Sequence, residues 1–183
     1  MSEQNIMDSS VFIATSLDGY IARQDGNLDW LDKANAIVPE GEDCGFVDFI
    51  STVDVLVMGS NTYAKVLSFG TWPYEILVIV LSQRDLSVPN ELSDQITISK
   101  EAPEDLVKRL SAAGKQRLNI DGASVIQSFL SKGLITDMTI TAIPVLIGEG
   151  ISLFGRTEKD IELEHISSKA YDFGFTQTKY LVK

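Results

Sequence analysis

The sequence has one cysteine, Cys44, and one histidine, His165, among 183 residues. A single cysteine excludes an internal disulfide framework and a zinc site built from several cysteines. A single histidine argues against a His-rich metal site and against a Ser-His-Asp triad. We therefore expect both residues to be structural, and we predict no metal.

Basic residues are also few. Lys and Arg number 15 against 26 Asp and Glu, which gives a formal net charge of -11. An acidic domain repels a phosphate backbone, so binding to nucleic acid is not expected. A small anionic cofactor would need local donors, such as helix N-termini, backbone amides or a well-placed arginine.

Long hydrophobic runs are missing as well. The longest aliphatic run covers residues 76–81, whereas a membrane-spanning helix needs about 20 residues. The first ten residues, MSEQNIMDSS, lack the basic and apolar regions of a secretory signal. We expect a cytoplasmic protein that acts on a small molecule and binds no membrane.

The remaining composition is that of an ordinary globular protein. Hydrophobic residues make up 44% and charged residues 22% of the chain, near the average for soluble domains. The length suits one domain, predicted to cover residues 1–183.

Strand and helix patterns alternate along most of the chain. Continuous apolar runs predict strands buried on both faces of a sheet, and helical spacing predicts helices between them. The strands are expected at 11–14, 53–58, 76–81 and 118–120, and the helices at 46–50, 103–110 and 125–130. This order favours an α/β sheet flanked by helices.

The C-terminal third has a different pattern. Apolar and polar residues alternate over 138–142, 161–166 and 173–182, which is typical of antiparallel strands with one exposed face. We therefore predict a mixed α/β domain whose sheet ends in antiparallel strands.

Three predicted strands end in small polar residues or glycine, at 59–62, 82–84 and 121–124. Ligands of open α/β sheets collect beyond the carboxyl ends of the strands, where helix N-termini offer free N–H groups. The usual G-x-G-x-x-G dinucleotide motif is missing. The alternative is that each segment is an ordinary strand-to-helix turn.

These segments also carry a family resemblance. The stretch 13–22 resembles the opening of the dihydrofolate reductase-like superfamily, above all the reductase branch of riboflavin biosynthesis, the RibD C-terminal domain. Residues 57–63 resemble its "MGRxTY" phosphate turn, and 121–123 resemble its "GG" diphosphate loop. Segments 134–137, 143–150 and 153–154 resemble its "GLIDEL…PVLLGxGxxLF" ending. The resemblance runs from about residue 11 to 181.

The resemblance implies an NADPH-dependent reductase similar to 5-amino-6-(5-phosphoribosylamino)uracil reductase, with hydride transfer to a small heterocyclic or ribosylamine substrate. It also implies a homodimer, for which apolar residues near the C-terminus could supply an interface. It places Asp18, Gly19 and Ile21 beside the nicotinamide. The other implied cofactor residues are Ala14, Gly59, Ser60, Asn61, Thr62, Ser82, Gln83, Arg84, Gly122, Ala123, Ser124 and Val125.

The sequence departs from the family pattern at two of these positions. Ser60 stands where the family often has arginine, so Arg84 is the only cation in the two turns expected at the adenosine 2′-phosphate. Ala123 replaces the second glycine of the diphosphate loop, where a methyl group would crowd a close approach.

Asp43 is the candidate proton donor. It precedes Gly59 by sixteen residues, roughly where dihydrofolate reductases carry their active-site acid. A helix over 42–52 would put Asp43 on an apolar face and raise the pKa of its carboxyl group. The alternative is that Asp43 only caps this helix. A dihydrofolate reductase and a non-catalytic nucleotide-binding protein therefore remain as alternative functions.

Overall fold

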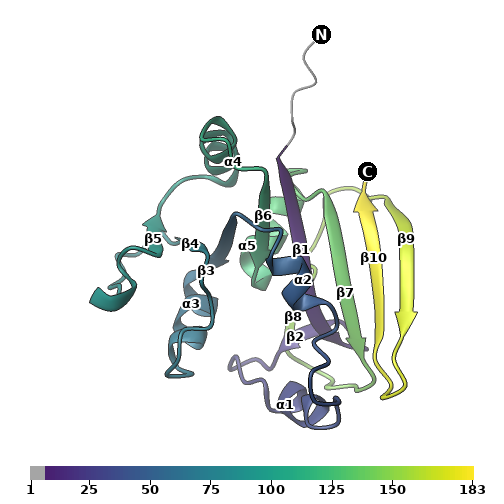
Figure 1. Cartoon of the computed structure of the whole chain (residues 1–183). Helices are drawn as coiled ribbons and strands as arrows, with labels where there is room; N and C mark the ends of the chain where they lie inside the picture. Colours follow the sequence, from purple (N-terminus) through teal and green to yellow (C-terminus); the bar gives the residue numbers. More distant parts are fainter. Residues whose placement is uncertain (1–6) are drawn as a thin grey trace.

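The computed structural model describes residues 7–183, so most of the segment examined for a secretory signal lies outside it. Its main feature is an eight-stranded sheet in the order β5-β4-β3-β6-β1-β7-β10-β9 (Figure 1). The strands are β1 (Asp8–Ser16), β3 (Val55–Gly59), β4 (Leu77–Leu81), β5 (Ile96–Ser99), β6 (Arg117–Asp121), β7 (Asp137–Ile143), β9 (Leu163–Ala170) and β10 (Thr176–Val182). A separate pair joins β2 (Tyr20–Ala22) to β8 (Ile151–Ser152). The predicted mixed α/β fold is confirmed.

Helices connect the parallel strands. They are α1 (Asp29–Asn35), α2 (Phe46–Ile50), α3 (Ser60–Leu67), α4 (Pro103–Ala112) and α5 (Ala123–Ser131), with a 3-10 turn at Asn90–Leu92. Helix α4 begins at Pro103, as its sequence predicts, because proline suits a first helical position. Within residues 7–183, no helix is both long and apolar enough to cross a membrane.

Strand β7 runs parallel to β1 along its whole length, from Ser10↔Asp137 to Ser16↔Ile143. The expectation of an antiparallel strand is therefore wrong for the pairing of β7 with β1, whereas β7 pairs antiparallel with β10, and β10 with β9, as predicted. Apolar and polar residues alternate along β7 because one face of the strand lies in the core and the other is polar. This alternation does not indicate whether the strand runs parallel or antiparallel to its neighbour. The connection through α5 decides the direction, because a helical crossover returns the chain parallel.

Different helices pack on the two faces of the sheet. Successive side chains of a strand point to opposite faces. Val11 belongs to the core cluster formed with α4 and α5. Phe12 points to the other face and packs against Phe46 and Phe49 of α2, with ring centroids 5.7 and 4.8 Å away. Helix α2 thus lies on the face opposite α4 and α5.

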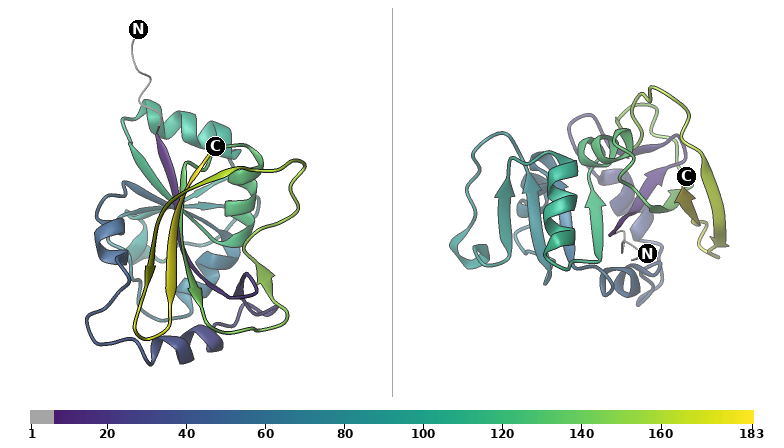
Figure 2. Two further views of the ribbon diagram at one scale, coloured as in Figure 1. Left: turned by 90° about the vertical axis from the view of Figure 1, so that its right-hand side faces the viewer. Right: turned by 90° about the horizontal axis from the view of Figure 1, so that it is seen from above.

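The β9–β10 hairpin stands at one edge of the molecule (Figure 2). All eight residues of β9 are exposed. Phe175 is buried and Phe173 packs against the same core cluster, so both contribute to the core rather than to a free surface. Leu181 is exposed. The homodimer stays a prediction.

Candidate functional site

The three predicted turns meet at one edge of the sheet. Strands β4, β3 and β6 are parallel neighbours, and their register pairs Gly59 with Leu81 and Met58 with Asp121. Their carboxyl ends therefore lie side by side. The segments 59–62, 82–84 and 121–124 follow these ends directly, so the fold brings together most of the residues assigned to the cofactor.

Two helices begin at this edge without side-chain caps. Gly59 precedes α3 and Gly122 precedes α5, and neither helix has a capping hydrogen bond from a side chain at its first turn. The first N–H groups of a helix have no partner within the helix and attract anions. These two helix ends therefore suit the phosphate groups of a dinucleotide.

The helix ends approach each other closely. Gly122 has φ +86°, and a Cβ atom there would lie 2.2 Å from the Thr62 Oγ1 atom. A Cβ atom on Gly59 would lie 3.2 Å from the Ser124 Oγ atom. Only glycine fits at Gly122. Ala123 is 9% exposed, so its methyl group is buried.

Arg84 links two of the turns. Its Nη2 atom donates to the Ser60 Oγ atom at 2.9 Å, and its backbone N–H donates to the Ser82 Oγ atom at 3.0 Å. The Arg84 side chain is exposed. Serine at position 60 thus serves as a hydrogen-bond partner that orients the Arg84 side chain between the two turns.

The loop after β1 forms the opposite rim. The Asp18 carboxylate accepts the N–H groups of Ile147 at 3.2 Å and Gly148 at 2.8 Å. The Ser16 hydroxyl, followed by these N–H groups, lowers the pKa of Asp18. The N–H of Leu153 donates to the Gly19 carbonyl at 3.0 Å. These hydrogen bonds therefore join the loop after β1 to the segment 147–153, beside the edge where the three turns meet.

The apolar residues predicted to line the cofactor have side chains that pack into the protein, so they could contact a cofactor mainly through their backbone. Val125 is buried in the core, Ile21 packs partly against the same cluster, and Ala14 packs against a second cluster that contains Trp30. The side chains of Asn61 and Gln83, in contrast, are exposed and could reach a ligand directly.

Asp43 does not have the expected environment. Its carboxylate is exposed and accepts the N–H groups of Gly45 and Val47, each at 2.8 Å. These hydrogen bonds lower the pKa of Asp43, with that from Val47 the largest cause. Helix α2 covers only Phe46–Ile50. The predictions of a helix over 42–52 and of a raised pKa are wrong. The N-cap of α2 is Gly45, and Asp43 accepts an N–H group of the first turn from two residues earlier.

Asp121 is the acid that the sequence analysis missed. It is half-buried at the carboxyl end of β6, and burial raises the pKa of its carboxyl group although the Gly122 N–H donates to it at 2.9 Å. Burial, and secondly the charge of Asp121, raise the pKa of Tyr74. Tyr74 packs edge-on against Trp72, with centroids 5.4 Å apart. The sequence signal for Asp121 was an acidic residue placed directly between a buried strand and a glycine turn.

The family assignment follows from sequence comparison. The model of the RibD C-terminal domain matches residues 10–176. The chain belongs to the RibD C-terminal domain family. The resemblance inferred from the motifs is confirmed, and with it the dihydrofolate reductase-like fold.

Relatives of this RibD-family chain cover most of its length. The uncharacterized protein YwjB of Bacillus subtilis (strain 168) is 33% identical over 166 residues, which is 88% of this chain and 90% of YwjB. A crystal structure from Shewanella sp. PV-4, of a protein assigned provisionally to riboflavin biosynthesis, has a TM-score of 0.91 and 44% identity, covering 97% of this chain and 99% of that one.

A more distant structure shares the fold. The Thermotoga maritima diaminohydroxyphosphoribosylaminopyrimidine deaminase/5-amino-6-(5-phosphoribosylamino)uracil reductase has a TM-score of 0.75 at 12% identity. It covers 98% of this chain, which spans 58% of the Thermotoga protein.

Proposed function

We propose that the chain is an NADPH-dependent reductase that reduces a small heterocyclic or ribosylamine substrate, as the uracil reductases of riboflavin biosynthesis do. The observation that carries the proposal is the meeting of two uncapped helix N-termini, those of α3 and α5, at one sheet edge. Membership of a reductase family supports it. The alternative of a dihydrofolate reductase rested on Asp43 and has lost that support.

Arg84 is the residue proposed to select NADPH. Its side chain lies between the turns that follow β3 and β4, where it reaches Ser60. NADPH carries a phosphate that NADH lacks, and a hydrogen bond between charged groups contributes about 1.5–3 kcal/mol. Arg84→Ala should therefore weaken NADPH binding by about 10–150-fold and leave NADH binding nearly unchanged.

Fluorescence titration of both cofactors against both proteins tests this assignment. The preference of the wild type for NADPH should also decline as salt is added, since an exposed ion pair is screened. An equal loss of affinity for the two cofactors would mean that Arg84 only holds its loop. A wild type without any preference would remove NADPH selectivity from the proposal.

Asp121 is the proposed proton donor. Bound NADPH supplies a hydride, so the chain has to supply the accompanying proton. A carboxyl group whose pKa is raised by burial retains its proton more readily than an exposed one. An anion bound at the N-terminus of α5 would add negative charge beside Asp121 and raise its pKa further. Cofactor binding and protonation of Asp121 would thus favour each other.

Two matched substitutions test this role, with NADPH oxidation measured against pteridines, pyrimidine ribosylamines and small carbonyl compounds. Asp121→Asn should lower turnover by about 10²–10⁴-fold and leave NADPH bound, whereas Asp43→Asn should leave turnover near that of the wild type. Equal turnover in the two variants would refute the assignment of Asp121. NADPH binding without oxidation on any of these substrates would favour the non-catalytic nucleotide-binding protein.

A further inference from the structure

Strand β1 parts from its neighbour β6 part-way along its length. β6 is in register with β1 only as far as Ser10↔Asn119, whereas β7 stays paired with β1 to Ser16. The second half of β1 therefore has a free edge on the side where β6 ends and α5 begins. A dinucleotide bound at the N-terminus of α5 would extend along this edge toward the loop 17–22, which continues β1.

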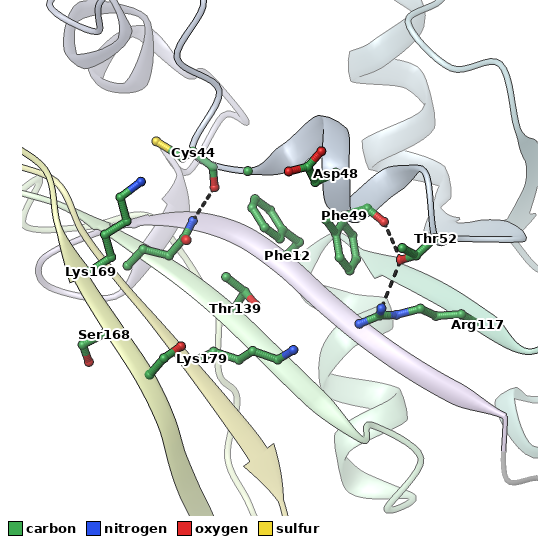
Figure 3. Close-up of a pocket in the computed structure, with 13 residues that line it drawn as sticks. Phe12, Cys44, Asp48, Phe49, Thr52, Arg117, Thr139, Ser168, Lys169 and Lys179 are labelled. Carbon is green, nitrogen blue, oxygen red and sulfur yellow. Dashed lines mark hydrogen bonds between the residues drawn. The ribbon is translucent and has the colours of Figure 1, made fainter.

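The same half of β1 borders a hollow on the face of the sheet that α2 covers (Figure 3). Phe12 lines this hollow, whose volume is about 370 Å³. A reductase has to bring its hydride donor and acceptor within about 3–3.5 Å of each other. The position of the loop at the end of β1 therefore matters for the proposed reaction.

The loop 17–22 is hydrogen-bonded along its length to the segment 145–153. The bonded partners are, in order, Leu17 with Val145, Asp18 with Ile147 and Gly148, Gly19 with Leu153, and strand β2 with β8. Leu17 and Asp18 are exposed, so burial does little to hold the first part of the loop. Its position follows that of the segment 145–153.

Helix α5 holds the end of this segment through Gln127. The segment 145–153 lies largely at the surface, and only Leu153 among its residues is buried. The Gln127 Nε2 atom donates to the Ser152 carbonyl at 3.0 Å and to the Leu153 carbonyl at 3.3 Å. Gln127 lies one turn after the N-terminus of α5, about 6 Å along the helix axis from Ala123.

Gly155 leaves room for the Gln127 amide. A Cβ atom on Gly155 would lie 2.7 Å from the Gln127 Oε1 atom and 3.0 Å from its Cδ atom. Gly155 is not among the glycines with positive φ, so this close contact, and not backbone strain, is what a side chain there would disturb. The chain after β8 thus lies directly against the Gln127 side chain.

We propose that Gln127 is a positioning residue, which fixes the loop 17–22 relative to the phosphate end of the cofactor site. Helix α5 would hold the diphosphate at its first turn, and one turn later it holds Ser152 and Leu153, to which the loop is bonded. One rigid helix then sets the distance between the two halves of the cofactor. The inference rests on the proposed function, because it takes the nicotinamide half of NADPH to lie beside this loop.

Amide hydrogen exchange measures the hold on the loop. Gln127→Met keeps the length of the side chain and removes both donors. Exchange in 17–22 and 145–153 should become about 2–10-fold faster for each hydrogen bond lost, and exchange in β3 should not change. Gln116→Met, at an exposed position just before β6, is the matched control. Wild-type exchange rates in Gln127→Met, or equal acceleration throughout the chain, would overturn the proposal.

Gly155→Ala disturbs the same contact without altering Gln127. Its methyl group displaces the flexible end of the Gln127 side chain, so exchange in the two segments should rise as it does in Gln127→Met. Gln127→Ala removes the atoms that the methyl group would meet. In that background Gly155→Ala should add nothing, and effects that simply add would contradict the proposed contact.

Two ligands separate positioning from folding: NADPH and 2′-phosphoadenosine diphosphoribose, which lacks the nicotinamide. In the wild type, NADPH should slow exchange in 17–22 more than the analogue does. Gln127→Met should bind the analogue as the wild type does and lose this extra slowing. Equal slowing by the two ligands in the wild type would overturn the inference alone, whereas a wild type that binds neither would remove the proposed function with it.

Turnover provides a further readout once the screen described above supplies a substrate. Gln127→Met should lower kcat by up to about 10²-fold, because small displacements of reacting groups are costly, and leave the KM for NADPH nearly unchanged. Arg84→Ala should do the reverse. A raised KM with the kcat of the wild type would assign Gln127 to cofactor binding and overturn its positioning role.

Discussion

Gly122→Ala should be among the most damaging single-methyl changes in this chain. Gly122 has φ +86° and ψ 138°, a conformation that costs other residues about 1–3 kcal/mol. The new Cβ atom would lie 2.2 Å from the Thr62 Oγ1 atom, where ordinary contact begins at 3.4 Å. Relieving such overpacking costs about 1–3 kcal/mol more. The expected loss of about 2–6 kcal/mol is a large part of a typical domain's stability of about 5–15 kcal/mol.

A double-mutant cycle separates the two causes. Thr62→Ala removes the clashing Oγ1 atom and leaves the Thr62 Cβ atom at 3.4 Å. In that background Gly122→Ala should cost only the backbone part, about 1–3 kcal/mol. The coupling between the two substitutions should therefore be about 1–3 kcal/mol.

Gly133→Ala provides the control. Gly133 also has a positive φ, +64°, but a Cβ atom there meets nothing within 4 Å. Its cost should be about 1–2 kcal/mol and should not change with Thr62→Ala. Urea denaturation of the single and double variants gives each free energy of unfolding. Costs that simply add at positions 62 and 122 would refute the close approach of α3 to the α5 turn.

Three further outcomes are expected. Arg109 and Ser99 lower the pKa of Glu101 to about 2 from its usual 4.5. Glu101→Gln should therefore be less stable than the wild type at neutral pH, and the difference should vanish as the pH falls from 4.5 toward 2, as acid denaturation curves would reveal. Asp43→Ala should likewise lose stability above pH 3.8, the ordinary pKa of that carboxyl group, and the loss should shrink as the pH falls below 3.8 toward the lowered pKa of the folded state, in the same experiment. Gly150→Ala would place a Cβ atom 2.3 Å from the Ala22 carbonyl oxygen; overpacking of about 1–3 kcal/mol should open the β2–β8 pair to proteolysis, and unchanged proteolysis would contradict this.

Local sequence was sufficient for the central strands and for the cofactor edge. Strands β3 and β4 are continuous apolar runs because both of their faces are covered by helices, and β6 carries the apolar pair Leu118 and Ile120 on either side of Asn119. Each is followed by glycine or small polar residues, and parallel strands place such turns at one edge. The meeting of these turns at one edge could therefore be predicted from separate segments, whereas the cofactor residues were named from the family resemblance.

The expected helix and raised pKa at Asp43 were wrong for a physical reason. Spacing put Asp43 on a helix, but Gly41, Cys44 and Gly45 have positive φ, so the chain turns before α2 and leaves Asp43 in solvent. Burial raises the pKa of Asp121, and burial and then the charge of Asp121 raise the pKa of Tyr74, which is far from it in sequence. Burial sets a carboxyl pKa, and burial is a property of the assembled fold.

The sequence by itself determined the family, the α/β order of elements and the turns that form the cofactor edge, because each depends on residues close together in the chain. Only the tertiary structure decided the direction of β7 relative to β1 and the burial of Asp121. Strand register and burial are set by contacts between segments far apart in sequence, so no local pattern could have revealed either.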